Sequence, residues 1–426
     1  MTERLPGFST LSIHAGAQPD PTTGARATPI YQTTSFVFND ADHAASLFGL
    51  QAFGNIYTRI GNPTNAVLEE RVAALEGGTA ALAVASGHAA QLVTFHALLQ
   101  PGDEFIAARR LYGGSINQFN HSFKNFGWNV VWADTDDVST FEKALSPKTK
   151  AIFIESIANP GGTVTDIEAI AAIARKAGVS LIVDNTLASP YLIKPIDHGA
   201  DIVLHSATKF LGGHGNSIGG IIVDAGTFDW SRDGRYPVLS EPRPEYHGIK
   251  LQETFGNFAF AIAARVIGLR DLGPALSPFN AFLILTGIET LGLRVQRHSD
   301  NAKAVAEWLS AHPAVAWVSY AGLPGDRYHN LARKYSPKGA GAVFTFGLKG
   351  GYDAGINLVS NVKLFSHLAN VGDTRSLIIH PASTTHSQLS DAQKAQAGAG
   401  VDVVRLSVGL EDKEDLIADL DQALKA

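Results

Sequence analysis

A single lysine, Lys209, follows a short apolar run and stands among hydroxyl side chains and glycines. The stretch at 201–215 reads DIVLHSATKFLGGHG, and its apolar run at 202–204 has the composition of a buried parallel strand. A lysine amine attacks carbonyl carbons once burial or a nearby cation lowers its pKa. Ser206 and Thr208 can donate hydrogen bonds to a phosphate, and glycines let the backbone approach a ligand closely. The stretch predicts a Schiff-base lysine; the alternative is a surface lysine in a loop.

Three more polar residues, Ser86, Glu155 and Asp184, lie at or just beyond the ends of other short apolar runs. Each of these runs has the length and composition of a buried strand. In open parallel sheets, ligands bind beyond the carboxyl ends of the strands. We therefore expect these three residues and Lys209 to share one site.

Asp184 ends the apolar run at 181–183. A buried carboxylate without a partner is costly, so this position demands a cation or hydrogen-bond donors. The protonated ring nitrogen of pyridoxal phosphate is one such partner, and a carboxylate beside it keeps the ring an electron sink. A helix-capping role before Asn185 and Thr186 is the alternative, and the sequence leaves both open.

A phosphate site is predicted where Ser86 is followed by Gly87 and His88 at the start of a helix. Backbone N–H groups at a helix start attract anions, so those of Gly87 and His88 are the useful groups. Tyr112 precedes two glycines and could stack on a cofactor ring, although a tyrosine of the core is the more common meaning.

Arg405 lies within the apolar run at 403–408, where a guanidinium needs an anion. A substrate carboxylate is a natural bidentate partner, and an internal salt bridge is the alternative. Asn159 begins the turn sequence NPGG, from which its side chain could reach a phenolic oxygen.

Apolar runs alternate with helix-like stretches through the first half of the chain, which indicates an α/β fold with a mostly parallel sheet. The expected strands are 80–85, 104–107, 130–132, 151–155, 181–184, 202–205 and 218–223. Further on, we expect a long helical stretch at 278–309, strands at 343–348, 376–379 and 403–408, and a final helix from about 413.

The expected organisation has three parts. Residues 1–60 show little periodicity and predict an extended arm that packs on a neighbouring subunit. Residues 61–260 would form the large cofactor-binding domain, and 261–426 a smaller C-terminal α+β domain. A chain of 426 residues is long enough for such a division.

Composition narrows the classes of function. Hydrophobic residues make up 45% and charged residues 17%, which is typical of a globular protein. The net charge of -6 and the lack of a basic tract argue against a nucleic-acid partner. No run reaches the ~18 apolar residues of a membrane span, no signal peptide is evident, and cysteine is absent. We expect a cytoplasmic protein without a metal site.

Taken together, the motifs resemble those of the Cys/Met-metabolism family of pyridoxal-phosphate enzymes, over nearly the whole chain. The most specific are YTRIGNPT at 57–64, VDNT at 183–186 and HSATKFLGGHG at 205–215. Within the family the chain is most similar to O-acetylhomoserine sulfhydrylases, through ETFGNFAF at 253–260 and the segments at 268–291 and 370–386. The resemblance implies the fold type I of PLP-dependent transferases, which is aspartate-aminotransferase-like.

The resemblance also implies how the cofactor is held. Lys209 would carry it as a Schiff base, Asp184 would pair with the ring nitrogen, and Tyr112 would stack on the ring. The phosphate would be held by Ser206, Thr208, Gly87 and His88.

Other implied contacts involve the substrate and a second subunit. Asn159 would lie near the phenolic oxygen of the cofactor. Arg405 would bind the substrate carboxylate, and Asn370 would belong to the substrate-binding strap. Tyr57 and Arg59 would reach the phosphate bound by a neighbouring subunit, which implies an oligomer, expected to be a homotetramer built from dimers.

The implied reaction is a γ-replacement of methionine biosynthesis. O-acetyl-L-homoserine and sulfide, or methanethiol, would give L-homocysteine, or L-methionine, and acetate. Lys209 would act as the general base and Tyr112 would assist departure of the leaving group. The alternative is a γ- or β-lyase that splits cystathionine or methionine on the same scaffold.

Two positions depart from related enzymes. Methionine γ-lyases carry cysteine where this chain has Gly114, and cystathionine-type members carry serine where it has Asn370. The first departure weakens the methionine γ-lyase alternative, and the second implies a substrate-binding strap that differs from that of the cystathionine-type members.

Overall fold

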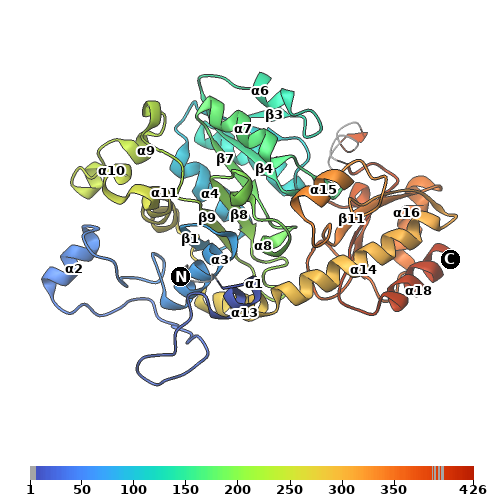
Figure 1. The fold of residues 1–426 in the computed structure, drawn as a ribbon, viewed down its shortest axis with the longest axis horizontal. Helices are drawn as coiled ribbons and strands as arrows, with labels where there is room; N and C mark the ends of the chain where they lie inside the picture. Colours follow the sequence, from blue (N-terminus) through green and yellow to red (C-terminus); the bar gives the residue numbers. More distant parts are fainter. Residues whose placement is uncertain (1–5, 386, 388–389, 392–393, 395–397) are drawn as a thin grey trace, which may run out of the picture.

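The computed structural model describes residues 6–385, 387, 390, 391, 394 and 398–426. A large sheet lies at the centre of the molecule, and a smaller sheet with its own helices lies to one side (Figure 1). The N-terminal segment extends away from the large sheet on the opposite side. None of the helices described has the length and apolar composition that crossing a membrane requires.

The large sheet has seven strands in the order β1-β9-β8-β7-β4-β2-β3. β9 runs antiparallel to β1 and β8, and the other neighbours pair in parallel, which confirms the expected mostly parallel sheet. The inner strands are buried along most of their length, as unbroken aliphatic runs predict. The strands are β1 (Ala80–Val84), β2 (Glu104–Ala108), β3 (Asn129–Ala133), β4 (Thr149–Glu155), β7 (Ser180–Asp184), β8 (Ile202–Ser206) and β9 (Gly220–Asp224).

Helices α3 (Pro63–Glu76), α4 (Gly87–Leu98) and α7 (Ile167–Ala177) pack on this sheet. The Oγ atom of Ser86 accepts a hydrogen bond from the Ala89 N–H at 3.1 Å and so caps α4. Thr64 is a residue type that often caps helices, and it precedes the apolar positions of α3, but it lies inside the helix. Asn62 caps α3 instead, because Pro63 is suited to the first helical position.

The smaller sheet has five strands in the order β10-β11-β14-β13-β12. They are β10 (Val315–Ser319), β11 (Val343–Leu348), β12 (Ser366–His367), β13 (Leu377–Ile379) and β14 (Val403–Ser407). Three of these strands were predicted. β10 and β12 were not, because β10 is partly exposed and β12 has only two residues. The final helix, α18 (Lys413–Leu424), begins where it was expected.

The long helical stretch predicted at 278–309 is two helices, α13 (Pro278–Glu289) and α14 (Leu291–Ala311). The helical conformation is interrupted at Thr290, which has φ -108° and ψ 12°. Apolar periodicity continues across the break, so the sequence pattern alone did not reveal it. Figure 1 shows α14 running from α13 towards the small sheet.

The N-terminal arm contains two helices that the sequence did not reveal, α1 (Phe8–His14) and α2 (Ala41–Phe48). α1 packs on α3 and α13, whereas α2 lies far out on the arm (Figure 1). Val37 is 97% exposed and Phe53 is 79% exposed. The arm therefore leaves apolar surface uncovered in a single chain, as expected of a segment that lacks its own core.

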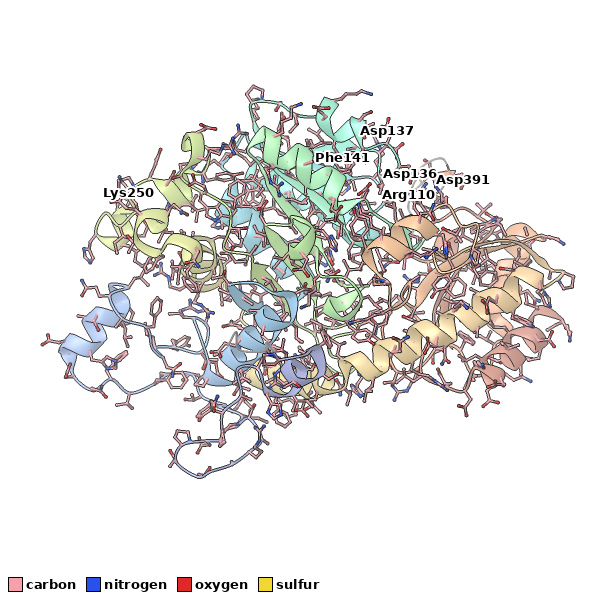
Figure 2. The ribbon with its side chains drawn as sticks, in the orientation of Figure 1. Arg110, Asp136, Asp137, Phe141, Lys250 and Asp391 are labelled. Carbon is pink, nitrogen blue, oxygen red and sulfur yellow. The ribbon has the colours of Figure 1, made fainter. Side chains whose placement is uncertain are left out.

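Shorter elements connect these parts. They are α5 (Gly113–Asn117), α6 (Ser139–Lys143), α8 (Ser189–Leu192), α9 (Pro237–Ser240), α10 (Leu251–Phe255), α11 (Ala259–Ala263), α12 (Arg270–Leu272), α15 (His329–Tyr335), α16 (Gly351–Asn361), β5 (Ile157–Ala158) and β6 (Thr163–Val164). Asp136, which lies near Arg110 in Figure 2, pairs with that arginine at 2.8 Å and accepts a hydrogen bond from the Tyr328 hydroxyl at 2.6 Å. This hydrogen bond links the loop after β3 to the residue that precedes α15.

Candidate active site

A pocket of about 280 Å³ lies at the carboxyl ends of β4, β7 and β8 and reaches across to β14. Residues far apart in the sequence meet there because parallel strands end at the same edge of a sheet. All predicted site residues except Tyr57 and Arg59 line it. They are Gly87, His88, Tyr112, Asn159, Asp184, Ser206, Thr208, Lys209, Asn370 and Arg405.

Lys209 projects into this pocket just beyond β8. Its Nζ atom donates a hydrogen bond to Oδ1 of Asn370 at 2.5 Å. Burial and, as the smaller cause, the positive charge of Arg405 together lower the pKa of the amine to about 8. A substantial fraction of the amine is therefore neutral, and nucleophilic, near neutral pH.

Asp184 ends β7 and is partly exposed to the pocket. Its Oδ1 atom accepts a hydrogen bond from the Thr186 N–H at 3.0 Å. It does not cap a helix, because the next helix, α8, begins only at Ser189. Burial raises the pKa of the carboxyl group, so a cationic partner bound in the pocket would stabilise the ionised form.

The N-terminus of α4 provides two backbone donors that have no partner in the described part of the chain. The first four N–H groups of a helix lack intrahelical partners. Those of Ala89 and Ala90 bind the Oγ and carbonyl oxygens of Ser86, which leaves the N–H groups of Gly87 and His88. A Cβ atom on Gly87 would lie 2.8 Å from Cβ of Ser206, so only glycine lets the helix approach β8 this closely.

The two predicted phosphate hydroxyls differ in their surroundings. Ser206 lines the pocket beside Gly87. The Thr208 hydroxyl donates to the Gly219 carbonyl at 3.2 Å and accepts from the Gly219 N–H at 3.1 Å. A phosphate would have to compete with Gly219 for the Thr208 proton, so Ser206 is the better placed donor.

Tyr112 presents its ring to the pocket and is 44% exposed. The ring lies edge-on to His88, with centroids 5.8 Å apart. A Cβ atom on Gly114 would lie 2.4 Å from the Tyr112 ring, so a larger residue there would displace it. The core-tyrosine alternative is therefore wrong.

Arg405 is buried on β14, and its guanidinium meets neutral oxygens. Nη1 donates to Oδ1 of Asn159 at 3.1 Å, and Nη2 donates to the Asn370 carbonyl at 3.0 Å. Nε is buried without a hydrogen-bond partner among the described residues. Burial lowers the pKa of this arginine to about 10. The internal salt bridge is not present in the described part of the chain, so the guanidinium is left for an anion.

Glu155 is the residue whose role sequence reasoning missed. Its two carboxyl oxygens accept from the backbone N–H groups of Tyr112 at 2.7 Å and Asn159 at 3.0 Å. It pairs in register with Asp184, and burial followed by the charge of Asp184 raises its pKa. The sequence placed Glu155 at this edge of the sheet but carried no signal for these backbone contacts.

Tyr57 and Arg59 lie outside the pocket of their own chain. The Arg59 guanidinium is 5.4 Å from the centroid of the Tyr57 ring and donates to the Arg270 carbonyl. Both residues belong to the arm rather than to the sheet edge. Any part they take in a site would have to be in that of another subunit.

The residues present fit pyridoxal phosphate. The pocket combines an amine of lowered pKa, a carboxylate whose ionised form a cation would stabilise, and an aromatic ring. It also contains a helix N-terminus whose close approach to β8 requires glycine at position 87. These match the aldehyde, the ring nitrogen, the ring face and the phosphate respectively. Within the described residues, no group of three histidine or carboxylate side chains could hold a metal ion.

The fold and the pocket define a pyridoxal-phosphate enzyme of fold type I, and comparison with known proteins agrees. The model of the family described as Cys/Met metabolism PLP-dependent enzyme matches residues 9–425, and the chain belongs to this family. The family resemblance, the fold class and the cofactor predicted from the sequence are thereby confirmed.

Particular relatives are similar over nearly their whole length. O-acetyl-L-homoserine sulfhydrylase 1 of Thermus thermophilus is 54% identical, with 98% of this chain and 99% of that one covered. O-acetyl-L-homoserine sulfhydrylase of Leptospira meyeri is 52% identical, with 98% and 96% covered. A solved O-acetylhomoserine (thiol)-lyase of Campylobacter jejuni, which carries an N'-pyridoxyl-lysine-5'-monophosphate, is 41% identical with a TM-score of 0.96, covering 99% and 100%.

The lowered pKa of Lys209 makes a prediction for the enzyme stripped of cofactor. The rate at which it takes up pyridoxal phosphate should rise about tenfold per pH unit below pH 8 and level off above it, because the neutral amine is the nucleophile. Stopped-flow absorbance measures this rate. In Arg405→Met, which removes the neighbouring cation, the pH at which the rate levels off should be higher, because the pKa of Lys209 rises. A wild-type rate still rising beyond about pH 10 would contradict the prediction.

Proposed function

We propose that the protein replaces the acetyl ester of O-acetyl-L-homoserine with sulfide, giving L-homocysteine and acetate. The observation that carries the proposal is Arg405, which is buried in the same pocket as Lys209 and has no carboxylate partner among the described residues. Such an arginine suits the α-carboxylate of an amino acid whose α-carbon must lie near the lysine amine. The names of the Thermus and Leptospira relatives support the ester and the sulfur donor.

Each pocket residue then has a task. Bound pyridoxal phosphate supplies an electron sink for negative charge at the substrate carbons. Lys209 moves protons at the substrate carbons, and its lowered pKa suits it to take and return them near neutral pH. Asn370 holds the free amine, while Asp184 keeps the ring nitrogen protonated. Tyr112 stacks on the ring and assists the leaving acetate.

Glu155 positions two of these groups. By accepting from the backbone N–H groups of Tyr112 and Asn159, it holds the ring-stacking residue and the amide that faces Arg405. With Oδ1 of Asn159 bound to Arg405, the Nδ2 group is left to donate to a phenolic oxygen.

Gly114 favours replacement over the lyase alternative. Because a side chain there would collide with the Tyr112 ring, an enzyme with cysteine at this position must place the ring differently. The sulfur donor, sulfide or methanethiol, is left to experiment.

The test is an assay of the purified enzyme with O-acetyl- or O-succinyl-homoserine and sulfide, with the products identified. Homocysteine and acetate from the acetyl ester are expected. Ammonia and a 2-oxo acid as the main products would overturn the proposal in favour of a lyase. Homocysteine from the succinyl ester alone would overturn the choice of acyl group.

The arm, residues 1–60, completes the site of a second subunit in this proposal, with Tyr57 and Arg59 at that subunit's cofactor phosphate. Its exposed apolar residues and its lack of a core support this. Residues 61–260 act as the large cofactor-binding domain, and 261–426 form the smaller C-terminal domain. A homotetramer and a cytoplasmic location stay predictions.

A shared site predicts recovery of activity in mixed subunits. Arg59→Ala and Lys209→Ala should each be nearly inactive alone. After subunit exchange, about half of the dimers would be mixed, and one of the two sites in each would have both wild-type groups, so about a quarter of wild-type activity should return. Steady-state assays measure this, with each variant exchanged against itself as the control. No recovery despite demonstrated exchange would count against a shared site.

A further inference from the structure

One face of α14 carries three buried polar residues, Arg294, His298 and Asn301. Their spacing of four and then three residues places them on the same side of the helix. They are 6%, 0% and 1% exposed, and none of them lines the pocket. Burying an arginine, a histidine and an asparagine in one row is costly unless each finds defined partners.

Arg294 binds the backbone that follows Lys209. Nη1 donates to the Phe210 carbonyl at 2.9 Å, and Nη2 donates to the Leu211 carbonyl at 3.2 Å. Nη2 also donates to the Gly287 carbonyl at 2.6 Å, at the end of α13. This cation is therefore held by carbonyl dipoles, and burial lowers its pKa to about 10.

The turn after Lys209 is shaped to receive this guanidinium. The Gly213 N–H donates to the Lys209 carbonyl at 2.7 Å, and Gly213 has φ +74°. A Cβ atom on Gly213 would lie 2.0 Å from Nη1 of Arg294, so both the conformation and the space require glycine. The carbonyls of three successive residues, 209 to 211, are thus all held.

His298 and Asn301 bind the backbone that follows Arg405. Nδ1 of His298 donates to the Val408 carbonyl at 2.7 Å, because that oxygen can only accept. Nδ2 of Asn301 donates to the carbonyls of Gly409 at 3.0 Å and Glu411 at 2.8 Å. Burial lowers the pKa of His298 to about 4, so the ring is neutral at physiological pH.

The two sets of contacts meet on the same helix. The His298 ring also packs edge-on against the Phe210 ring, with centroids 5.3 Å apart. Two successive turns of α14 therefore contact both the segment after Lys209 and the segment that follows β14, the strand that carries Arg405. Apolar packing would hold the helix equally well but would let it slide, whereas hydrogen bonds to particular carbonyls specify a register.

We propose that this face of α14 sets the separation between Lys209 and Arg405, with Arg294, His298 and Asn301 as positioning residues. The inference rests on the proposed function in one respect, that Arg405 holds the substrate carboxylate. The distance between Lys209 and Arg405 then determines how far the substrate's α-carbon lies from the Lys209 amine. A misplacement of about 1 Å costs about 100-fold in rate, so the helix decides how well the amine reaches the α-proton.

The test compares holoenzymes of wild type, Arg294→Lys, Arg294→Met and Asn301→Ser. Arg294→Lys keeps the charge but cannot bind two carbonyls with a planar fork. The control is Lys303→Met, which removes a cation from an exposed i,i+4 ion pair on the same helix. The first measurement is exchange of the α-proton of L-alanine in D₂O, per bound cofactor, which needs no leaving group.

A second measurement does not depend on activity. Hydrogen–deuterium exchange reports on the amides of 209–213 and 405–411, of which those of Gly212 and Gly213 are hydrogen-bonded within the turn. We expect the Arg294 variants to lose about 10- to 100-fold in α-proton exchange and in kcat, with KM changed by less than about 3-fold and faster amide exchange at 209–213. Asn301→Ser should speed amide exchange at 405–411 instead.

The outcomes separate this inference from the proposed function. If the Arg294 variants lower Tm but keep α-proton exchange per bound cofactor within about twofold of wild type, α14 is merely structural and the inference is overturned. If Arg294→Met fails to fold, Arg294→Lys and Asn301→Ser carry the test. If wild type exchanges the α-proton but makes no homocysteine, the proposed function fails while the role of α14 is still decided by the variants.

Discussion

Lys209→Ala is expected to abolish turnover, with kcat at least about 1,000-fold below wild type. The amine is the pocket group whose pKa is lowered to about 8, and Asn370 holds it 2.5 Å from its side-chain oxygen. A positioned general base alone contributes about 10²- to 10⁴-fold, and the variant also loses the covalent attachment of the cofactor. Steady-state assays with homocysteine detection measure the loss, and the absorbance of bound cofactor should change in the same variant.

Two controls separate chemistry from packing. Lys209→Met keeps the length and apolar stem of the side chain without the amine, so it should be as inactive as Lys209→Ala with a near wild-type Tm. Methylamine added to Lys209→Ala should restore part of the α-proton exchange, because a small amine can occupy the space that the side chain leaves. Turnover like that of wild type in either variant would mean that another group is the base.

The strands of the large sheet were predictable because their burial depends on local composition. β7 and β8 are aliphatic runs buried on both faces, and short runs of this kind are typical of the inner strands of parallel sheets. β12 has two residues and β10 is partly exposed, so neither carries a pattern. At the break at Thr290, Arg294 donates hydrogen bonds to the Thr290 hydroxyl and the Gly287 carbonyl. No local pattern contains that information.

Some residues of the site were likewise predictable from the sequence and others were not. The places of Asp184, Lys209 and Arg405 at the pocket were predictable, because a charged side chain at a strand end or inside an apolar strand needs a partner. The contacts of Glu155 and Arg294 were not predictable, because both bind backbone atoms of segments distant in sequence. Backbone N–H and carbonyl groups are present at almost every residue, so a side chain that recognises them leaves no partner to find in the sequence.

Arg405→Ala is expected to lower kcat/KM by roughly 10- to 200-fold. A charged bidentate contact with a carboxylate contributes about 1.5–3 kcal/mol, and its loss converts to that range. The guanidinium is buried, and its Nε has no hydrogen-bond partner among the described residues, so it can accept the anion without breaking an existing salt bridge. Most of the loss should fall on KM, because the contact is made before the chemical step and kept through it.

Arg405→Lys tests whether the two parallel donors of a guanidinium are needed or a positive charge alone is enough. Lysine keeps the charge but not the two parallel donors, and it cannot also hold Oδ1 of Asn159 and the Asn370 carbonyl, so rescue should be partial. The cofactor content and the absorbance without substrate should match wild type in both variants, because the contact is with the substrate. If Arg405→Ala lost the cofactor, or kept normal kcat/KM, the arginine would be acting through Asn159 and Asn370 to hold the pocket together rather than through the substrate carboxylate.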